Sequence, residues 1–261
     1  MKILLTNDDG YRSEAYQLLG QALQKKHDVT MIAPEKNCSG IAHAFTLLEP
    51  LFSTDMQEVE NSFKLKEFSH LSGTPVDCVK FSLLEAMKDD LPDMVISGIN
   101  YGANLACDVL YSGTVGAAIE AYVHGVSSIA LSYKEHNFSK ERVQEVIDWF
   151  IPFLDQVEAH MLEKPRLLNI NYPPVSPKEI QGVKACEVGT VGYKDFYDKR
   201  TSPLGKDYFW LSGTMEEEKE NKASDKFAVQ HNYISVSPLK IDFTNHQELK
   251  SLEGILQDIK V

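Results

Sequence analysis

The sequence lacks any run of apolar residues approaching the roughly 20 that a membrane-spanning helix requires. Its first apolar stretch ends at Thr6 and passes directly into polar Asn7, which is too short for the core of a secretory signal. We therefore expect a soluble cytoplasmic protein that makes no use of a membrane.

Cysteine is scarce, and its spacing is uninformative for metal or redox chemistry. Cys38, Cys78, Cys107 and Cys186 form no CxxC pair, so the sequence predicts neither a zinc site nor a thioredoxin-like redox centre. Reduced and mostly buried thiols are the expected outcome.

Basic residues are also few: the chain has 26 Lys and Arg against 38 Asp and Glu, which gives a formal net charge of −12. Nucleic-acid polymers are held by clustered basic residues, so this balance argues against such a partner. A small anionic ligand stays compatible with the composition if a metal ion supplies positive charge locally. No GxGxxG follows the first apolar run, which argues against a dinucleotide-dependent oxidoreductase.

What the sequence does contain is a regular alternation of short apolar runs and amphipathic segments. Strands are predicted over 2–6, 28–33, 94–97, 127–131, 167–171 and 233–236, and helices over 13–25, 75–87, 115–124, 141–160 and 246–259. This alternation predicts an α/β fold in three layers, Rossmann-like and doubly wound, with a mainly parallel sheet.

The alternation breaks down between Pro173 and Lys222, where Gly, Pro and aromatic residues are scattered around a charged run at 216–220. We interpret this stretch as an extended arm or hairpin with a solvated loop. Residues 1–261 are expected to form a single domain, with a core over about 1–172 and arm and C-terminal elements over about 173–261.

Three polar loops follow predicted strands, and in an open parallel sheet such loops meet at the carboxyl edge. They are Asn7-Asp8-Asp9-Gly10, Asn37-Cys38-Ser39-Gly40 and the stretch from Ser97 to Asn104. Their side chains offer carboxylate, hydroxyl and amide oxygens, which suit Mg²⁺ or Mn²⁺ better than zinc. In a turn, adjacent Asp8 and Asp9 can converge on one cation, although ordinary capping or an Asx-turn would equally explain them.

A second chemical signal is Ser112-Gly113-Thr114, placed directly before an apolar helix. Free amides and the helix dipole make such a position an anion site, while simple capping by Ser112 or Thr114 is the alternative.

The histidines lack a recognisable catalytic spacing and are expected to be structural, with His43 the most interesting because it closely follows Ser39-Gly40.

Ordered blocks along the chain resemble the SurE family of stationary-phase survival proteins, which act as nucleoside monophosphate phosphatases. The blocks are Ile3-Leu4-Leu5-Thr6-Asn7-Asp8-Asp9-Gly10, Ala33-Pro34-Glu35-Lys36-Asn37-Cys38-Ser39-Gly40, Gly73-Thr74-Pro75-Val76-Asp77, Ser97-Gly98-Ile99-Asn100-Tyr101-Gly102-Ala103-Asn104, Tyr111-Ser112-Gly113-Thr114, Asn169-Ile170-Asn171-Tyr172-Pro173 and Tyr233-Ile234-Ser235-Val236-Ser237-Pro238.

The resemblance implies a 5′-nucleotidase acting on nucleoside 5′-monophosphates, with 3′-monophosphates as further candidate substrates. It implies one divalent metal ion per subunit, Mg²⁺ or Mn²⁺, and a homodimer or homotetramer with exchanged C-terminal elements. The residues implied are Asp8 and Asp9 for catalysis, Asp8, Asp9, Ser39 and Asn100 for the metal, and Asn104, Ser112, Gly113 and Thr114 for the phosphate.

Two places in the sequence depart from the family pattern. Tyr11-Arg12-Ser13-Glu14 replaces the usual turn after the acids, and Asn232 stands where a Gly is usual.

Two alternatives for mechanism and function also stay open at this point. Asp8 could form an aspartyl-phosphate instead of assisting a water, and the same crevice could serve a nucleotide-binding sensor without turnover.

Overall fold

The structure is a computed structural model that describes residues 1–55, 68–135, 139–217, 221–257 and 259. In this described part, strand β1 (Lys2–Thr6) lies inside a nine-stranded sheet of order β3-β4-β2-β1-β5-β6-β7-β11-β8. The other strands of this sheet are β2 (Asp28–Pro34), β3 (Ser53–Asp55), β4 (Phe68–Leu71), β5 (Met94–Tyr101), β6 (Ser127–Tyr133), β7 (Leu167–Tyr172), β8 (Gly182–Ala185) and β11 (Tyr233–Pro238).

The centre of the sheet is parallel, as the sequence predicts. Strands β4, β2, β1, β5, β6 and β7 run in one direction, whereas β3 pairs antiparallel with β4, and β11 pairs antiparallel with β7 and parallel with β8. The chain leaves β1 for β2 on one side and later returns to β5 on the other. Loops that follow β1 and β5 therefore diverge at this switch point and leave a crevice between them.

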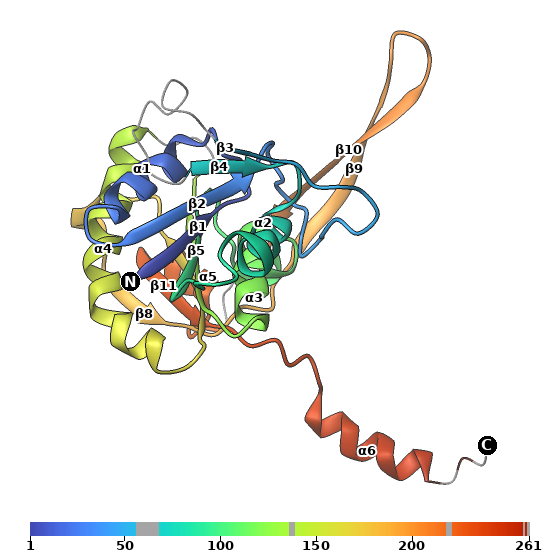
Figure 1. The fold of residues 1–261 in the computed structure, drawn as a ribbon. Coiled ribbons are helices and arrows are strands. Elements are labelled where there is room, and N and C mark those ends of the chain that lie inside the picture. Colours follow the sequence, from blue (N-terminus) through green and yellow to red (C-terminus); the bar gives the residue numbers. More distant parts are fainter. Residues whose placement is uncertain (56–67, 136–138, 218–220, 258, 260–261) are drawn as a thin grey trace.

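Helices cover both faces of the sheet (Figure 1). They are α1 (Glu14–Leu23), α2 (Pro75–Phe81), α3 (Gly113–Val123), α4 (Lys140–Glu163) and α5 (Asp225–Gln230), whereas α6 (His246–Leu256) lies away from the sheet. Alternate residues of β1 enter different apolar cores: Ile3 and Leu5 lie in the core that includes α1 and α4, while Leu4 packs with residues of α2 and α3. The predicted three-layer α/β fold is thereby confirmed.

Some helices and strands of the structure were not predicted from the sequence pattern. β3, β4, β8, α5 and the 3-10 helix Ala106–Leu110 are not among the predicted elements, and the predicted helix over 75–87 is α-helical only to Phe81 before a π-helical turn, Ser82–Ala86. The predicted arm contains a hairpin of β9 (Tyr193–Thr201) and β10 (Asp207–Met215). Residues 218–220 of the charged run and residue 258 of the last predicted helix lie outside the described residues.

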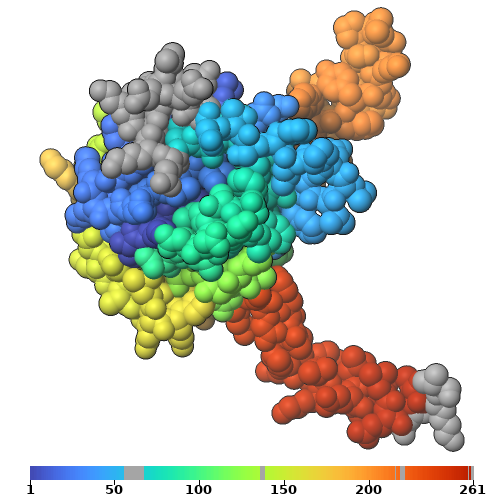
Figure 2. Space-filling view, viewed as in Figure 1, coloured from blue at the N-terminus to red at the C-terminus, as the bar shows by residue number. Residues whose placement is uncertain are grey.

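Two segments project from the body of the molecule, namely the β9–β10 hairpin and the C-terminal segment that carries α6 (Figures 1 and 2). Every residue of α6 is exposed. Within the described residues, no helix is both long enough and apolar enough to cross a membrane.

Candidate active site

The first acidic loop is shaped by a compact turn directly after β1. The Asn7 side chain accepts from the Gly10 N–H at 3.2 Å and donates to the Gly10 carbonyl at 3.0 Å. Gly10 has a φ of 95°, and a β-carbon there would lie 3.2 Å from the Lys36 carbonyl carbon. Glycine is therefore required for the loop after β1 to pass against the loop after β2.

Asp8 is held firmly by the start of α3. Its carboxylate is 2% exposed and accepts from Thr114 at both oxygens, from the hydroxyl at 2.5 Å and from the backbone N–H at 3.1 Å. Burial raises the pKa of Asp8, while the two hydrogen bonds from Thr114 oppose that rise. In this arrangement Thr114 orients Asp8, and this use of its hydroxyl and amide is one that sequence reasoning missed.

Asp9 lies beside Asp8 and accepts from the Tyr101 N–H at 3.2 Å and from the Asn37 side-chain amide at 3.4 Å. Burial is the largest cause that raises its pKa to about 7, and the negative charge of Asp8 adds to it. Two neighbouring carboxylates whose charge is disfavoured in this way form a place where a cation would be stabilised.

A polar cavity of about 270 Å³ lies at this edge of the sheet. Five of the eight predicted site residues line it, namely Asp8, Ser39, Asn100, Asn104 and Ser112. Of the others, Gly113 lies behind Asp8, since a β-carbon on Gly113 would be 3.0 Å from Asp8 Cβ. Gly113, Thr114 and Asp9 thus adjoin the lining residues without being part of the wall.

The part of the wall formed by Asn104 depends on a network of amides. Asn104 donates its side-chain amide to Ser132 at 2.8 Å, and its N–H to Asn171 Oδ1 at 2.7 Å. Asn169 and Asn171 in turn donate to the Asn104 carbonyl. Asn169 and Asn171 belong to a block that carries the family resemblance, yet only the fold reveals that they position Asn104.

The beginning of α3 combines capping with an open anion position. Ser112 accepts from the Val115 N–H at 3.1 Å, so the capping interpretation is correct for Ser112. The Thr114 N–H serves Asp8, while the described residues offer no acceptor to the Gly113 N–H. Ser112 and the Gly113 amide are consequently the groups of this turn that suit a phosphate.

The donor set fits a hard divalent cation. Two carboxylates, the Ser39 hydroxyl and the Asn100 amide meet the preference of Mg²⁺ or Mn²⁺ for oxygen. The Asn100 amide nitrogen donates to the Gly102 carbonyl at 2.7 Å, which leaves the amide oxygen for a cation. Among the described residues, no three His, Cys, Asp or Glu side chains are grouped as a metal site, in keeping with a set that has only two carboxylates.

Further lining residues were not predicted. Asp108, Tyr111 and Tyr193 line the same cavity, and the Tyr193 hydroxyl donates to Asp108 at 3.1 Å. Burial raises the pKa of Asp108, while the hydrogen bond from Tyr193 lowers it. Tyr193 begins the β9–β10 hairpin, so the projecting arm contributes a residue to the cavity.

A larger cavity of about 580 Å³ is mainly apolar and lies between α3 and the segment leading to α6. Most of its lining is aliphatic or aromatic, and its polar side chains, His43, Ser112 and Lys240, include no carboxylate that could hold a divalent cation. The polar cavity at the switch point is therefore the candidate active site.

The departures from the family pattern have simple structural roles. Tyr11 is buried and stacks on His70 with ring centroids 4.4 Å apart, and the Arg12 guanidinium lies 4.5 Å from the centre of the Tyr11 ring. Asn232 takes a φ of 62°, which glycine and asparagine tolerate better than other residues.

A doubly wound parallel sheet with a carboxylate-rich cavity at its switch point, next to an open helix N-terminus, defines an α/β enzyme suited to phosphate chemistry. The family description "Survival protein SurE" matches residues 3–195, and the chain belongs to this family. It is 38% identical over 258 residues to "5'-nucleotidase SurE" of Thermosipho africanus, covering 99% of this chain and 98% of that one.

Other similarities extend along the whole chain. A protein named "5'-nucleotidase SurE" from Thermoanaerobacter sp. is 40% identical over 261 residues and covers all of both chains. The crystal structure of the SurE protein from Aquifex aeolicus superimposes with a TM-score of 0.81 at 32% identity, covering 98% of this chain and 99% of the other.

Proposed function

We propose that the chain is a divalent-metal-dependent phosphomonoesterase that hydrolyses nucleoside 5′-monophosphates to nucleoside and phosphate. The observation that supports it most is the cavity that brings Asp8, Ser39 and Asn100 together with Ser112 at the start of α3, because it combines oxygen ligands for a cation with a position suited to an anion. Relatives over the full length carry the name 5'-nucleotidase SurE.

In the proposed site, Asp8, Asp9, Ser39 and Asn100 would hold one Mg²⁺ or Mn²⁺, and Asn104, Ser112 and Gly113 would surround the phosphate. Thr114 would adjoin the phosphate and orient Asp8 beside it. A bound metal would polarise a phosphoryl oxygen of the substrate and lower the pKa of a water molecule. Asp9 is the carboxylate with the freer surroundings, and it accepts or orients the proton of the attacking water. The Gly113 N–H and the dipole of α3 stabilise charge on the transferring phosphoryl group.

Direct attack by water is proposed over a phosphorylated Asp8, because the hydrogen bonds from Thr114 weaken both Asp8 oxygens as nucleophiles while leaving each a lone pair for a cation. Single-turnover hydrolysis in ¹⁸O-labelled water should leave the label in phosphate and none in the protein. Label at Asp8, found by mass spectrometry of the digested protein, would instead establish the aspartyl-phosphate route.

Metal removal gives the direct test of the function. With EDTA present, the purified protein is expected to release no phosphate from nucleoside 5′- or 3′-monophosphates, and added Mn²⁺ or Mg²⁺ should restore release, because the paired carboxylates hold no substrate oxygen on their own. A panel with phenyl phosphates and polyphosphate ranks the substrates. Nucleotide binding without release under any metal would support the sensor.

We also propose that the chain, a single domain with its core at about 1–172, forms a homodimer or homotetramer through the elements of about 173–261. Helix α6 supports this, since Leu249, Leu252, Ile255 and Leu256 give it one apolar stripe and are 43–61% exposed.

Replacing Leu252 and Ile255 by Glu should therefore reduce the assembly to smaller species in light scattering coupled to size exclusion. Adding the same two charges at Gln247 and Ser251, on the polar side of α6, is the matched control and should change nothing. A wild-type monomer at micromolar concentration would contradict the assembly.

A further inference from the structure

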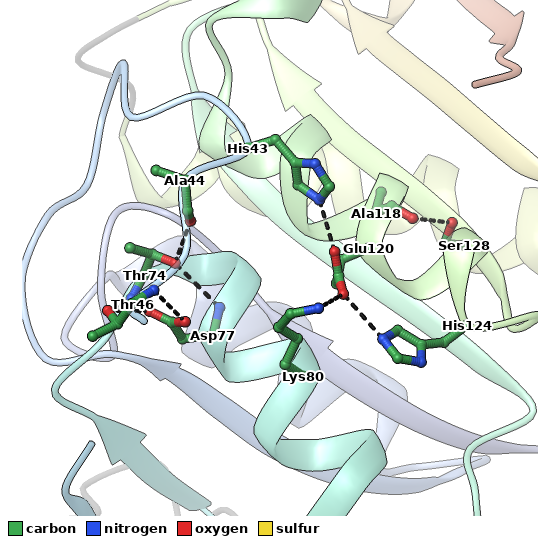
Figure 3. Close-up of polar contacts among 10 residues, drawn as sticks. All are labelled: His43, Ala44, Thr46, Thr74, Asp77, Lys80, Ala118, Glu120, His124 and Ser128. Carbon is green, nitrogen blue, oxygen red and sulfur yellow. Dashed lines mark hydrogen bonds and ion pairs between the residues drawn. The ribbon is translucent and has the colours of Figure 1, made fainter. Parts of the chain in front are cut away.

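A buried carboxylate on α3 connects three parts of the molecule next to the active site. The Glu120 side chain is 4% exposed. Its Oε1 accepts from Lys80 Nζ of α2 and from His124 Nε2 at 3.0 Å, and its Oε2 pairs with His43 Nε2 at 2.9 Å (Figure 3). The two carboxylate oxygens thus contact different elements: Oε1 contacts side chains of α2 and the end of α3, and Oε2 contacts a loop.

Neutralisation of the buried Glu120 charge accounts for the contacts at Oε1 only. A buried carboxylate needs a nearby cation and hydrogen bonds, and Lys80 together with His124 supplies both at Oε1. His43 is different because it comes from a loop, the segment 38–46 between β2 and β3, and its side chain is 41% exposed. The contact at Oε2 therefore connects a surface loop to the helix whose N-terminus forms the phosphate site.

The same loop carries Ser39, and it is fixed on either side of that residue. On one side the Cys38 N–H donates to the Asp8 carbonyl at 2.7 Å. On the other, the Ala42 N–H donates to the Tyr111 carbonyl at 2.9 Å. Ala42 also packs directly on α3, since a β-carbon on Gly116 would lie 2.7 Å from the Ala42 carbonyl oxygen.

Beyond His43 the loop is attached to α2. The Thr46 N–H and hydroxyl donate to the two Asp77 oxygens at 2.8 and 2.7 Å, and the Thr74 hydroxyl donates to the Ala44 carbonyl at 2.7 Å (Figure 3). His43 lies between these attachments and Ser39, so its contact with Glu120 joins the first half of the loop to α3, where the Ile41 side chain also packs at Gly113.

We propose that the His43–Glu120 pair is a positioning contact that holds the loop 38–46, and with it Ser39, at the metal-binding cavity. This inference rests on the proposed role of Ser39 as a metal ligand. Supporting groups behind ligands set their orientation, and their loss typically weakens metal binding by about 10- to 100-fold.

Two histidines that share one carboxylate give a matched pair of variants. His43→Leu removes the contact from the loop, whereas His124→Leu removes one from within α3 itself and leaves the loop attached. Hydrogen–deuterium exchange of the metal-free protein should quicken about 10-fold in peptides covering 38–46 for His43→Leu and stay unchanged for His124→Leu. Calorimetric titration with Mn²⁺ should show a Kd about 10-fold weaker for His43→Leu alone.

His43→Gln keeps a nitrogen donor near the position of Nε2 and should restore most of the protection and affinity, with all three variants unfolding cooperatively near the wild-type temperature. Unchanged exchange and affinity in His43→Leu, or equal changes in His124→Leu, would overturn the inference. Exchange and Mn²⁺ titration need no turnover, so a wild type that binds Mn²⁺ without hydrolysing nucleotides would contradict the proposed function and leave this test intact.

Discussion

The Asp9→Asn variant is expected to lose at least about 10³-fold in kcat/KM toward nucleoside monophosphates, because it removes both a proposed metal ligand and the proposed proton acceptor. The fold should survive, since an asparagine oxygen can still accept from the Tyr101 N–H that now meets Asp9 at 3.2 Å.

The same substitution should stabilise the metal-free protein. The pKa of Asp9 is about 7 in the folded state and close to 3.8 when unfolded. Between those values the folded state binds the extra proton, so stability falls as pH rises from about 4 to about 7. At pH 8, Asp9→Asn should therefore raise the free energy of unfolding of the metal-free protein by about 2 kcal/mol.

Urea unfolding in EDTA at pH 5 and pH 8, together with steady-state kinetics in Mn²⁺, measures both effects. The stabilisation should be largest at pH 8 and shrink toward pH 5. Glu35→Gln is the control, because Glu35 is an exposed carboxylate near the same loops and its loss should alter neither quantity. Near-normal turnover by Asp9→Asn would remove Asp9 from the proposed catalytic pair.

Gly98→Ala should be strongly destabilising, lowering the free energy of unfolding by about 3 kcal/mol or more. Gly98 has a φ of 141°, and a β-carbon there would collide with the Leu131 carbonyl oxygen of β6. The pairing of β5 with β6 shifts register between Gly98 and Asn100, an irregularity that redirects Asn100 at the edge of the cavity. Residual folded protein should therefore also bind Mn²⁺ more weakly.

Gly125→Ala separates the collision from the backbone preference. Gly125 has a φ of 79°, but a β-carbon there would meet nothing within 4 Å, so about 1 kcal/mol is expected. Urea midpoints of the two variants should differ clearly. Equal midpoints would mean that β6 moves aside without difficulty at Leu131.

The central fold was accessible from the sequence because apolar runs such as Lys2–Thr6 and Met94–Ser97 are buried on both faces, and the helix at Glu14–Leu23 is amphipathic. Strand β3, Ser53–Asp55, is exposed at every residue and so lacks the apolar pattern that identifies a strand. Helix α5, Asp225–Gln230, is too short for periodicity to detect.

The candidate site divides in the same way. The carboxyl ends of parallel strands could be placed together from their pairing alone, so Asp8 and Ser39 were predictable in the loops after their strands, and Asn100 near the end of β5, which runs to Tyr101 and not only to Ser97. Tyr193 approaches Asp108 from a distant hairpin, and Glu120 meets His43 across two elements, contacts that only tertiary packing creates. Neither His43 nor His124 has a recognisable catalytic spacing in the sequence, and only the fold shows that both reach Glu120.

The pairing of β1 with β5, which aligns Ile3 with Met94, has a consequence for how the chain folds. The two halves of the proposed metal site, Asp8 after β1 and Asn100 within β5, come from strands that meet only after a long loop of chain has closed, and such long-range parallel pairing is slow. Metal ions should accordingly leave the refolding rate almost unchanged and act by slowing unfolding, because the interactions they make form after the transition state.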